Sequence, residues 1–260
     1  MAARVSRAYR DRGVVLRTHR LGETDRIVTL LLEGHGKVRA VAKGVRRPGS
    51  RIGARLEPFS HVDLELHRGR SLDVVRQVET LDTNETLRID DRLHAAASVM
   101  VELADAVSGE GQRDLPLLLQ LRAGLAALGA DPSSAEVFVD AFLLRAASVV
   151  GFPVLTAACA RCRTPGPHDR LSVVGGGTLC ADCGGEGTRR VAAEVVEAVR
   201  LLGEDGSWQA LPALARERPD ARATAGSYAR AFVEHHLDRR LRSYDALAAD
   251  GTGSEGGDRG

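Results

Sequence analysis

Four cysteines are the residues of this sequence whose type and spacing indicate chemistry most directly. Cys159 and Cys162 form one C-x-x-C pair, and Cys180 and Cys183 form a second pair after 17 intervening residues. This is the spacing of a four-cysteine zinc site, in which two tight turns direct four thiolates at one ion. Four thiolates fill a tetrahedral shell and leave no position for water or substrate. We therefore expect one structural zinc ion rather than a catalytic one.

The alternative for the cysteines is two redox-active pairs. A thioredoxin-type C-x-x-C requires a surrounding β-α-β pattern, and the sequence shows none. His168 could replace a cysteine as a ligand, although nothing requires it. Between the pairs, residues 171–174 followed by three glycines predict a short strand and a tight turn, as in a zinc ribbon. We expect this zinc module to span residues 157–186.

A basic stretch near the N-terminus is the second informative feature. No acidic residue lies between Glu33 and Glu57, whereas seven basic residues do. Small apolar residues alternate with basic ones in its first part, which predicts a strand with one basic face, and a Gly/Pro/Ser-rich loop follows. The alternative is an ordinary solvated surface, but a run of one sign repels itself without an anionic partner. The pattern suits a phosphate backbone, and the candidate DNA-binding residues are Lys37, Arg39, Lys43, Arg46, Arg47, Arg51 and Arg55.

The charge of the chain is unevenly distributed. Residues 1–80 hold 17 Lys and Arg against 9 Asp and Glu, a net charge of +8, whereas residues 81–260 hold 19 against 26, a net charge of −7. This division predicts separate domains with separate partners, the first of them anionic. We find neither an apolar signal sequence nor a run of about 18 apolar residues, and we therefore expect a cytoplasmic, nucleoid-associated protein without membrane contact.

Common catalytic motifs are missing from the sequence. It has no P-loop, no H-E-x-x-H and no H-x-E, and its glycine clusters do not follow a strand and open a helix. A nuclease would require a cluster of metal-binding carboxylates, which we do not find. We therefore expect a protein that is not an enzyme.

Hydrophobic periodicity predicts an α+β protein with more than one domain. Five short strands, near residues 13–20, 26–33, 37–43, 59–67 and 72–80, predict a small closed barrel such as the OB-fold, although strand count alone does not exclude an SH3-like barrel or a small sandwich. Helical patterns follow from residue 82, with starts at Asp90 or Asp91, at Asp114 and at Asp131. We expect an OB-fold nucleic-acid-binding domain at residues 1–81, a helical domain with the inserted zinc module at residues 82–247, and a disordered tail at residues 248–260.

These motifs, in this order, carry a family resemblance. The most specific is GKVRAVAKGVRRPGS at residues 36–50 with LEPF at 56–59; GVVL from residue 13, LGETD from 21, GFPVL from 151 and LRS at 241–243 also fit. Over residues 9–247 the sequence resembles the bacterial DNA repair and recombination mediator RecO.

The resemblance implies a non-enzymatic protein that binds single- and double-stranded DNA and anneals complementary strands. It implies that the protein acts with RecR, and often RecF, to replace single-strand-binding protein with RecA. Contact with the acidic C-terminal tail of single-strand-binding protein is expected through the helical domain. By position, the seven basic residues named above are the DNA-backbone candidates, and the four cysteines are the zinc ligands.

The aromatic content of the barrel region qualifies this expectation. Many OB-folds stack bases on aromatic rings, but residues 1–80 contain only Tyr9 and Phe59. We therefore expect binding through phosphates more than through stacking. The alternative, from another functional class, is a zinc-ribbon transcription or translation accessory factor that acts mainly through protein contacts. Substitutions of basic barrel residues distinguish the two functions: they should lower DNA affinity in a DNA-binding mediator and leave it unchanged in an accessory factor.

Overall fold

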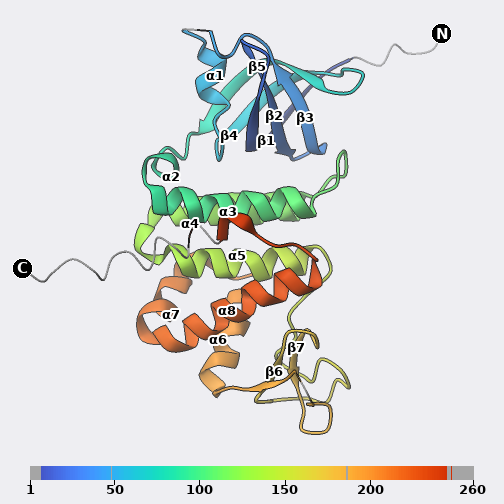
Figure 1. Ribbon diagram of the computed structural model, residues 1–260, viewed down its shortest axis with the longest axis vertical. Helices are drawn as coiled ribbons and strands as arrows, with labels where there is room; N and C mark the ends of the chain where they lie inside the picture. The colour runs from blue at the N-terminus through green and yellow to red at the C-terminus, as the bar shows by residue number, and fades with distance from the viewer. Residues whose placement is uncertain (1–6, 48, 186, 245–246, 248–260) are drawn as a thin grey trace, which may run out of the picture.

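The structure is a computed structural model that describes residues 7–47, 49–185, 187–244 and 247. The barrel lies at one end of an elongated molecule, the helices lie in the middle, and the cysteine module lies at the other end (Figure 1). The predicted combination of a barrel, a helical part and a cysteine cluster is confirmed. The predicted disordered tail at residues 248–260 lies outside the described residues. In the part of the chain that is described, no helix combines the length and apolar character needed to cross a membrane.

Five strands close into an OB-like barrel in the order β1-β2-β3-β5-β4. All neighbours pair antiparallel except β3 and β5, which run parallel. Side chains that alternate along the strands fill the interior, among them Leu30 and Leu64, which are fully buried. The strands are β1 (Ala8–Leu21), β2 (Asp25–Leu32), β3 (Gly36–Ala42), β4 (His61–His67) and β5 (Asp73–Asp82).

Strand β1 is longer than the sequence pattern predicts. Its first half pairs with β4, from Ala8 opposite His67, and its second half pairs with β2, ending at Leu21 opposite Asp25. A bulge near Val15 separates the two halves. One strand thus pairs with two neighbours, which closes the barrel. The alternation of residues along β1 does not reveal this double pairing.

A short helix, α1 (Arg51–Arg55), lies in the connection that the sequence predicts as a loop. The hydroxyl of Ser50 accepts a hydrogen bond from the Gly53 N–H at 3.3 Å and caps the helix. A side chain at position 53 would not fit, because a Cβ there would lie 2.3 Å from the carbonyl oxygen of Val45. Five residues are too few to show a helical period, so sequence analysis missed this helix.

The helical part contains seven α-helices among the described residues, and two of the predicted caps are confirmed. The Asp90 side chain accepts from the Leu93 N–H at 2.9 Å, and the Asp114 side chain accepts from the Leu117 N–H at 3.1 Å. A 3-10 turn (Pro132–Ser134) precedes the helix predicted to start at Asp131. The helices are α2 (Thr86–Ile89), α3 (Asp91–Val107), α4 (Leu115–Ala130), α5 (Ala135–Val149), α6 (Ala193–Gly203), α7 (Leu211–Glu217) and α8 (Pro219–His236).

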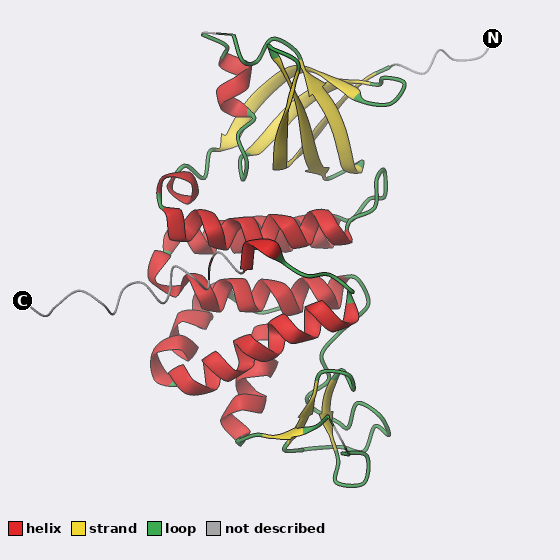
Figure 2. Cartoon of the chain, in the orientation of Figure 1, coloured by secondary structure: helices red, strands yellow, loops and turns green. Residues whose placement is uncertain are grey.

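Besides the core that fills the barrel interior, a second hydrophobic core is shared by the barrel and the helices. Val14, Leu31 and Phe59 of the barrel belong to the same buried cluster as the side chains of α3, α4 and α5. Figure 2 shows helices directly beneath the barrel. Phe59 is 1% exposed, has a left-handed backbone (φ 72°), and meets the ring of His94 edge to face at 5.2 Å. The junction between barrel and helices is therefore packed rather than a flexible linker.

Candidate nucleic-acid interface and metal centre

Three neighbouring strands bring two arginines into one row on the outside of the barrel. Arg17 on β1 lies opposite Thr29 on β2, and Thr29 lies opposite Arg39 on β3. Adjacent strands are about 4.8 Å apart, so the two arginines stand roughly 10 Å apart with Thr29 between them. Both arginines are exposed, whereas Thr29 is buried. This row forms the edge of the outer face that adjoins the helices.

Farther along the same strands the face becomes apolar. His19, Ile27 and Val41 form the next row in register. Leu21, at the end of β1, is 39% exposed. Apolar surface bordered by cations is a suitable platform for a nucleic-acid strand, and His19 carries the one aromatic ring in these rows, which favours phosphate contacts over base stacking. We call the surface formed by these rows and the loop after β3 the barrel face.

The basic loop after β3 is fastened to the turn between β1 and β2. The guanidinium Nη1 of Arg46 donates to the carbonyl oxygen of Glu23 at 2.9 Å. The carboxylate of Asp25 accepts from the Gly44 N–H at 2.8 Å, and this bond, with a second from the Thr24 hydroxyl, holds the pKa of Asp25 below its usual value. These contacts keep the exposed basic residues of the loop beside the barrel face: Lys43, Arg46 and Arg47.

Two of the predicted DNA-binding residues are engaged elsewhere. The ammonium of Lys37 reaches the helical part, where it donates to the backbone carbonyl oxygen of Asp105 at 2.6 Å. Arg55 donates from Nη1 to the carbonyl oxygen of Val78 at 2.8 Å and fastens α1 to β5. The side chain of Arg51 is outside the described part of the structure. The structure thus gathers Arg39, Lys43, Arg46 and Arg47 around the barrel face.

The basic run at residues 34–56 does not reveal that β1 and β2 also contribute to this face. Arg17, His19 and Leu21 alternate along the first predicted strand, and this alternation is the signal that could have identified them. Their position beside Arg39 depends on the register of three strands, which the sequence does not show. Arg17 also contacts the helical part, through a 3.1 Å ion pair with Asp105.

The second candidate site is the cysteine cluster. The sulfur atoms of the two C-x-x-C pairs all lie within 4.8 Å of one another, and Cys162 Sγ is 3.6 Å from Cys180 Sγ. Zinc–sulfur bonds of about 2.3 Å in a tetrahedron place sulfur atoms roughly 3.8 Å apart, so the cluster has the dimensions of a metal site. The predicted hairpin between the pairs is present as β6 (Arg170–Ser172) and β7 (Gly177–Leu179), with β8 (Arg189–Arg190) on the other side of β6.

Hydrogen bonds around the first cysteine pair favour thiolates. Burial opposes ionisation of Cys159, but the N–H groups of Cys162, Cys180 and Arg161 point at its sulfur and lower its pKa to about 5. By contrast, hydrogen bonds with the neighbouring sulfurs raise the pKa of Cys183 to about 12. Four thiolates this close together repel one another unless a cation lies between them. The four cysteines can therefore hold a metal ion.

His168 does not belong to this cluster. Its Nε2 donates to the carbonyl oxygen of Thr164 at 2.9 Å, and the ring thereby braces the first cysteine turn. The metal-ligand group found among the described residues is the four cysteines.

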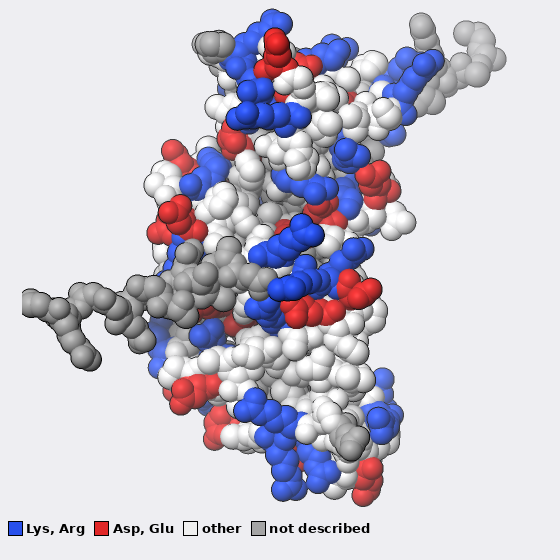
Figure 3. All heavy atoms as spheres, viewed as in Figure 1, with Lys and Arg blue, Asp and Glu red and all other residues white. Residues whose placement is uncertain are grey.

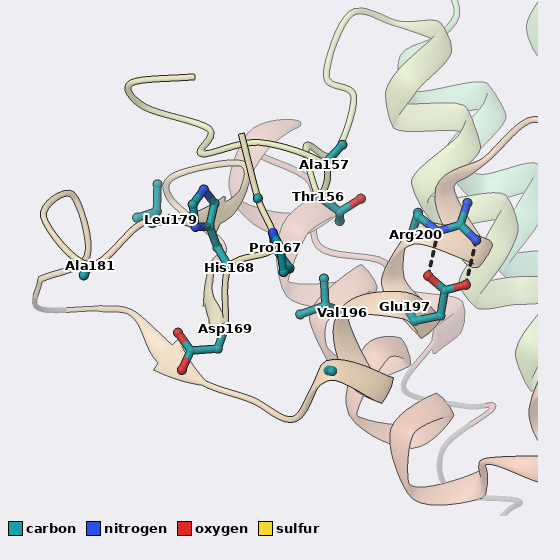
Figure 4. A pocket seen from close by; sticks show the side chains of 12 residues that line it. Thr156, Ala157, Pro167, His168, Asp169, Leu179, Ala181, Val196, Glu197 and Arg200 are labelled. Atoms are coloured by element: carbon teal, nitrogen blue, oxygen red, sulfur yellow. Dashed lines mark hydrogen bonds and ion pairs between the residues drawn. The ribbon is translucent and has the colours of Figure 1, made fainter. Parts of the chain in front are cut away.

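A cavity of about 760 Å³ separates the cysteine module from α6. Figure 4 shows Pro167 and Leu179 on the module side and Val196 on the helix side. Arg200 reaches both carboxylate oxygens of Glu197, at 2.6 and 2.7 Å, so its charge is balanced within the protein. The cavity presents a concave apolar surface to a ligand. Its lining residues do not form an acid–base pair suited to catalysis.

Comparisons with known families match both the barrel part and the helical part of the chain. A family model described as recombination protein O, N terminal, matches residues 6–84. A second model, recombination protein O, C terminal, matches residues 92–245, which alone is more than half of the 260 residues. The chain therefore belongs to the recombination protein O (RecO) family, whose members act as mediators of DNA recombination and repair with DNA and recombination proteins as partners.

Proposed function

We propose that this protein binds the backbone of single- and double-stranded DNA on its barrel face and anneals complementary strands without ATP. The observation that carries the proposal is the row Arg17–Thr29–Arg39, with Lys43 farther along the same face. Cations along the edges neutralise phosphates, so two strands can approach each other. Because His19 carries the one aromatic ring in these rows, most base edges remain available for pairing.

We infer that the helical part carries the protein contacts. Family membership supports a role beside RecR, and often RecF, in replacing single-strand-binding protein with RecA. The acidic C-terminal tail of single-strand-binding protein is the expected ligand of the helical part. Residues 81–260 have a net charge of −7, which keeps this part from acting as a second general polyanion binder.

We assign the metal of the cysteine cluster as one Zn²⁺ ion with a structural role. Four thiolates in a tetrahedral arrangement are the typical ligand set of structural zinc, and they leave no open coordination position. The ion would join the two C-x-x-C turns and keep the module folded beside α6. The proposed function therefore includes no chemical step at the metal, and the protein acts without catalysis.

The test is annealing of two complementary oligonucleotides, one of them coated with cognate single-strand-binding protein, in the absence of ATP. We expect the protein to accelerate annealing, and we expect Arg39→Glu with Lys43→Glu to abolish the acceleration. The matched control is Arg189→Glu with Arg218→Glu, which makes the same change in charge at two exposed arginines outside the barrel, one in β8 and one directly before α8. The control should anneal like the wild type.

Two results would contradict the proposal. Unchanged affinity of the barrel-face variant for both single- and double-stranded DNA would show that DNA does not bind this face. Intact DNA binding without acceleration of annealing would leave a DNA-binding adaptor that works through its protein partners.

A further inference from the structure

A short basic segment follows α8 and lies against α3 and α5. We call residues 237–244 the C-terminal strap (Figure 1). Three of its eight residues are arginines, in a part of the chain that is acidic as a whole. All three arginines are exposed: Arg239, Arg240 and Arg242.

The backbone of the strap is held by contacts on its inner side. The Glu102 carboxylate of α3 accepts from the N–H groups of Arg242 at 3.1 Å and Ser243 at 2.8 Å. Between the exposed arginines, Leu241 is 1% exposed and belongs to the shared core. The hydroxyl of Tyr244 donates to the buried carboxylate of Asp140 at 3.3 Å. Anchors hold the inner side of the strap, and its exposed charged residues are three arginines and one aspartate, Asp238, so its outer edge is cationic.

The strap adjoins the barrel face through two carboxylates on one helix. Glu102 holds the strap, and Asp105, three residues later on α3, forms the ion pair with Arg17. Residues three apart on a helix are about 5–6 Å apart at their Cβ atoms, so strap and barrel face meet at this turn of α3. Figure 3 shows Lys and Arg atoms over the junction between barrel and helices and again over the segment after α8, in one view of the molecule.

We propose that the C-terminal strap extends the DNA site, so that a single strand leaving the barrel face at Arg17 crosses α3 and continues along Arg239 and Arg242. The inference rests on the proposed function of the barrel face and adds a second contact region to it. Of the two carboxylates on the way, Asp105 is paired with the cations of Arg17 and Lys37, whereas Glu102 keeps its charge and is held by two backbone N–H groups of the strap. Counted together, the five cations Arg17, Lys37, Arg239, Arg240 and Arg242 outnumber the three carboxylates Glu102, Asp105 and Asp238, so the path has a net positive charge for a phosphate backbone.

Oligothymidylate binding measured over a range of salt concentrations tests the proposal. A strand of about 6 nucleotides fits one OB-fold site, whereas a strand of about 20 nucleotides reaches beyond it. We expect Arg239→Gln with Arg242→Gln to leave the affinity for the short strand unchanged. For the long strand, loss of two phosphate contacts should make the slope of log K against log salt less negative by about 1.4 and weaken binding about 25-fold at 0.1 M salt.

The control Arg189→Gln with Arg218→Gln removes the same charge from exposed positions outside the strap. If the strap variant matches this control on the long strand, in both affinity and slope, the strap does not contact DNA. Failure of the barrel-face proposal has a different signature, in which Arg39→Glu with Lys43→Glu leaves the affinity for the short strand unchanged. A variant that weakens the short and long strands equally would also overturn the extension, because the strap would then act within the barrel site.

Discussion

Lys37 in the barrel and Asp105 on α3 form a contact that joins the two parts of the protein. The ammonium lies 3.3 Å from a carboxylate oxygen of Asp105 and 2.6 Å from its backbone carbonyl oxygen, and both side chains are 15% exposed. The bond to the carbonyl is the directed one, while the carboxylate contact is an ion pair without hydrogen-bond geometry. The first basic residue of the predicted DNA-binding stretch therefore contributes to the contact between the barrel and the helices.

Replacement of Lys37 should weaken the fold more than it weakens DNA binding. Lys37→Met removes a charged hydrogen bond from a partly buried site, so we expect the free energy of unfolding to fall by about 1.5–3 kcal/mol. Urea unfolding measures this change. Arg39→Met, at an exposed position two residues along the same strand, is the control and should lower stability by less than about 0.5 kcal/mol. If Lys37→Met keeps full stability and weakens DNA binding more than Arg39→Met, Lys37 belongs to the DNA interface instead.

Substitution in the cysteine cluster should remove the metal. Elemental analysis of the wild type should find about one zinc per chain, and Cys162→Ser should lose it, because three ligands bind the ion less tightly than four. A loss of about 4 kcal/mol of stability would lower the Tm by roughly 8–16 °C in a chain of this size. His168→Gln is the control, since His168 lies outside the cluster, and it should retain the metal. A Cys162→Ser protein with unchanged Tm would rule out a structural role for the ion.

Asp140 should make stability depend on pH. Its burial raises its pKa to about 7, and this effect outweighs the opposing interaction with Arg222, 3.3 Å away. The native state then binds a proton that the unfolded state releases near pH 4, so this contribution is complete below about pH 4 and is lost as the pH rises towards 7. The expected slope is about −1.4 kcal/mol per pH unit in that window.

The measurement is urea unfolding of wild type and Asp140→Asn at several pH values. His61, whose burial lowers its pKa to about 4, acts with the opposite sign between pH 4 and 6.5, because there the unfolded state binds the extra proton. The difference between wild type and Asp140→Asn cancels the His61 contribution, which is common to both. We expect the variant to gain stability relative to wild type as the pH rises. A difference independent of pH would mean that Asp140 is ionised in the native protein throughout this range.

Phe59 should couple the unfolding of the barrel to that of the helices. Phe59→Ala leaves a cavity in the shared core, with an expected loss of about 3–5 kcal/mol. Trp208, the single tryptophan of the chain, is buried in the helical part, so its fluorescence reports on that part alone. Because the core is shared, Phe59→Ala should lower the urea midpoint measured by Trp208 fluorescence together with the midpoint measured by circular dichroism. Ile89→Ala, at a side chain that is 73% exposed, is the control and should shift neither. An unchanged Trp208 midpoint in Phe59→Ala would show that the two parts unfold independently.

The sequence alone determined the features that depend on residues close together in the chain. Two C-x-x-C pairs predict a metal cluster because each pair forms its own turn. Asp90 and Asp114 predict helix starts because a side chain can cap only the N–H groups that follow it. Alternation around Arg39 predicts a strand with a basic outer face, since successive residues of a strand point to opposite sides.

Only the tertiary structure decided which of these features meet. The register of β1, β2 and β3 places Arg17 beside Arg39, and a shift by one residue would have turned Arg17 into the barrel. Packing of α3 under the barrel brings Asp105 to Lys37 and takes that lysine out of the open basic surface. The position of the C-terminal strap depends on Glu102, which lies 140 residues away from Arg242 in the sequence. Such contacts arise from the burial of a shared core, a property of the whole chain that no local pattern contains.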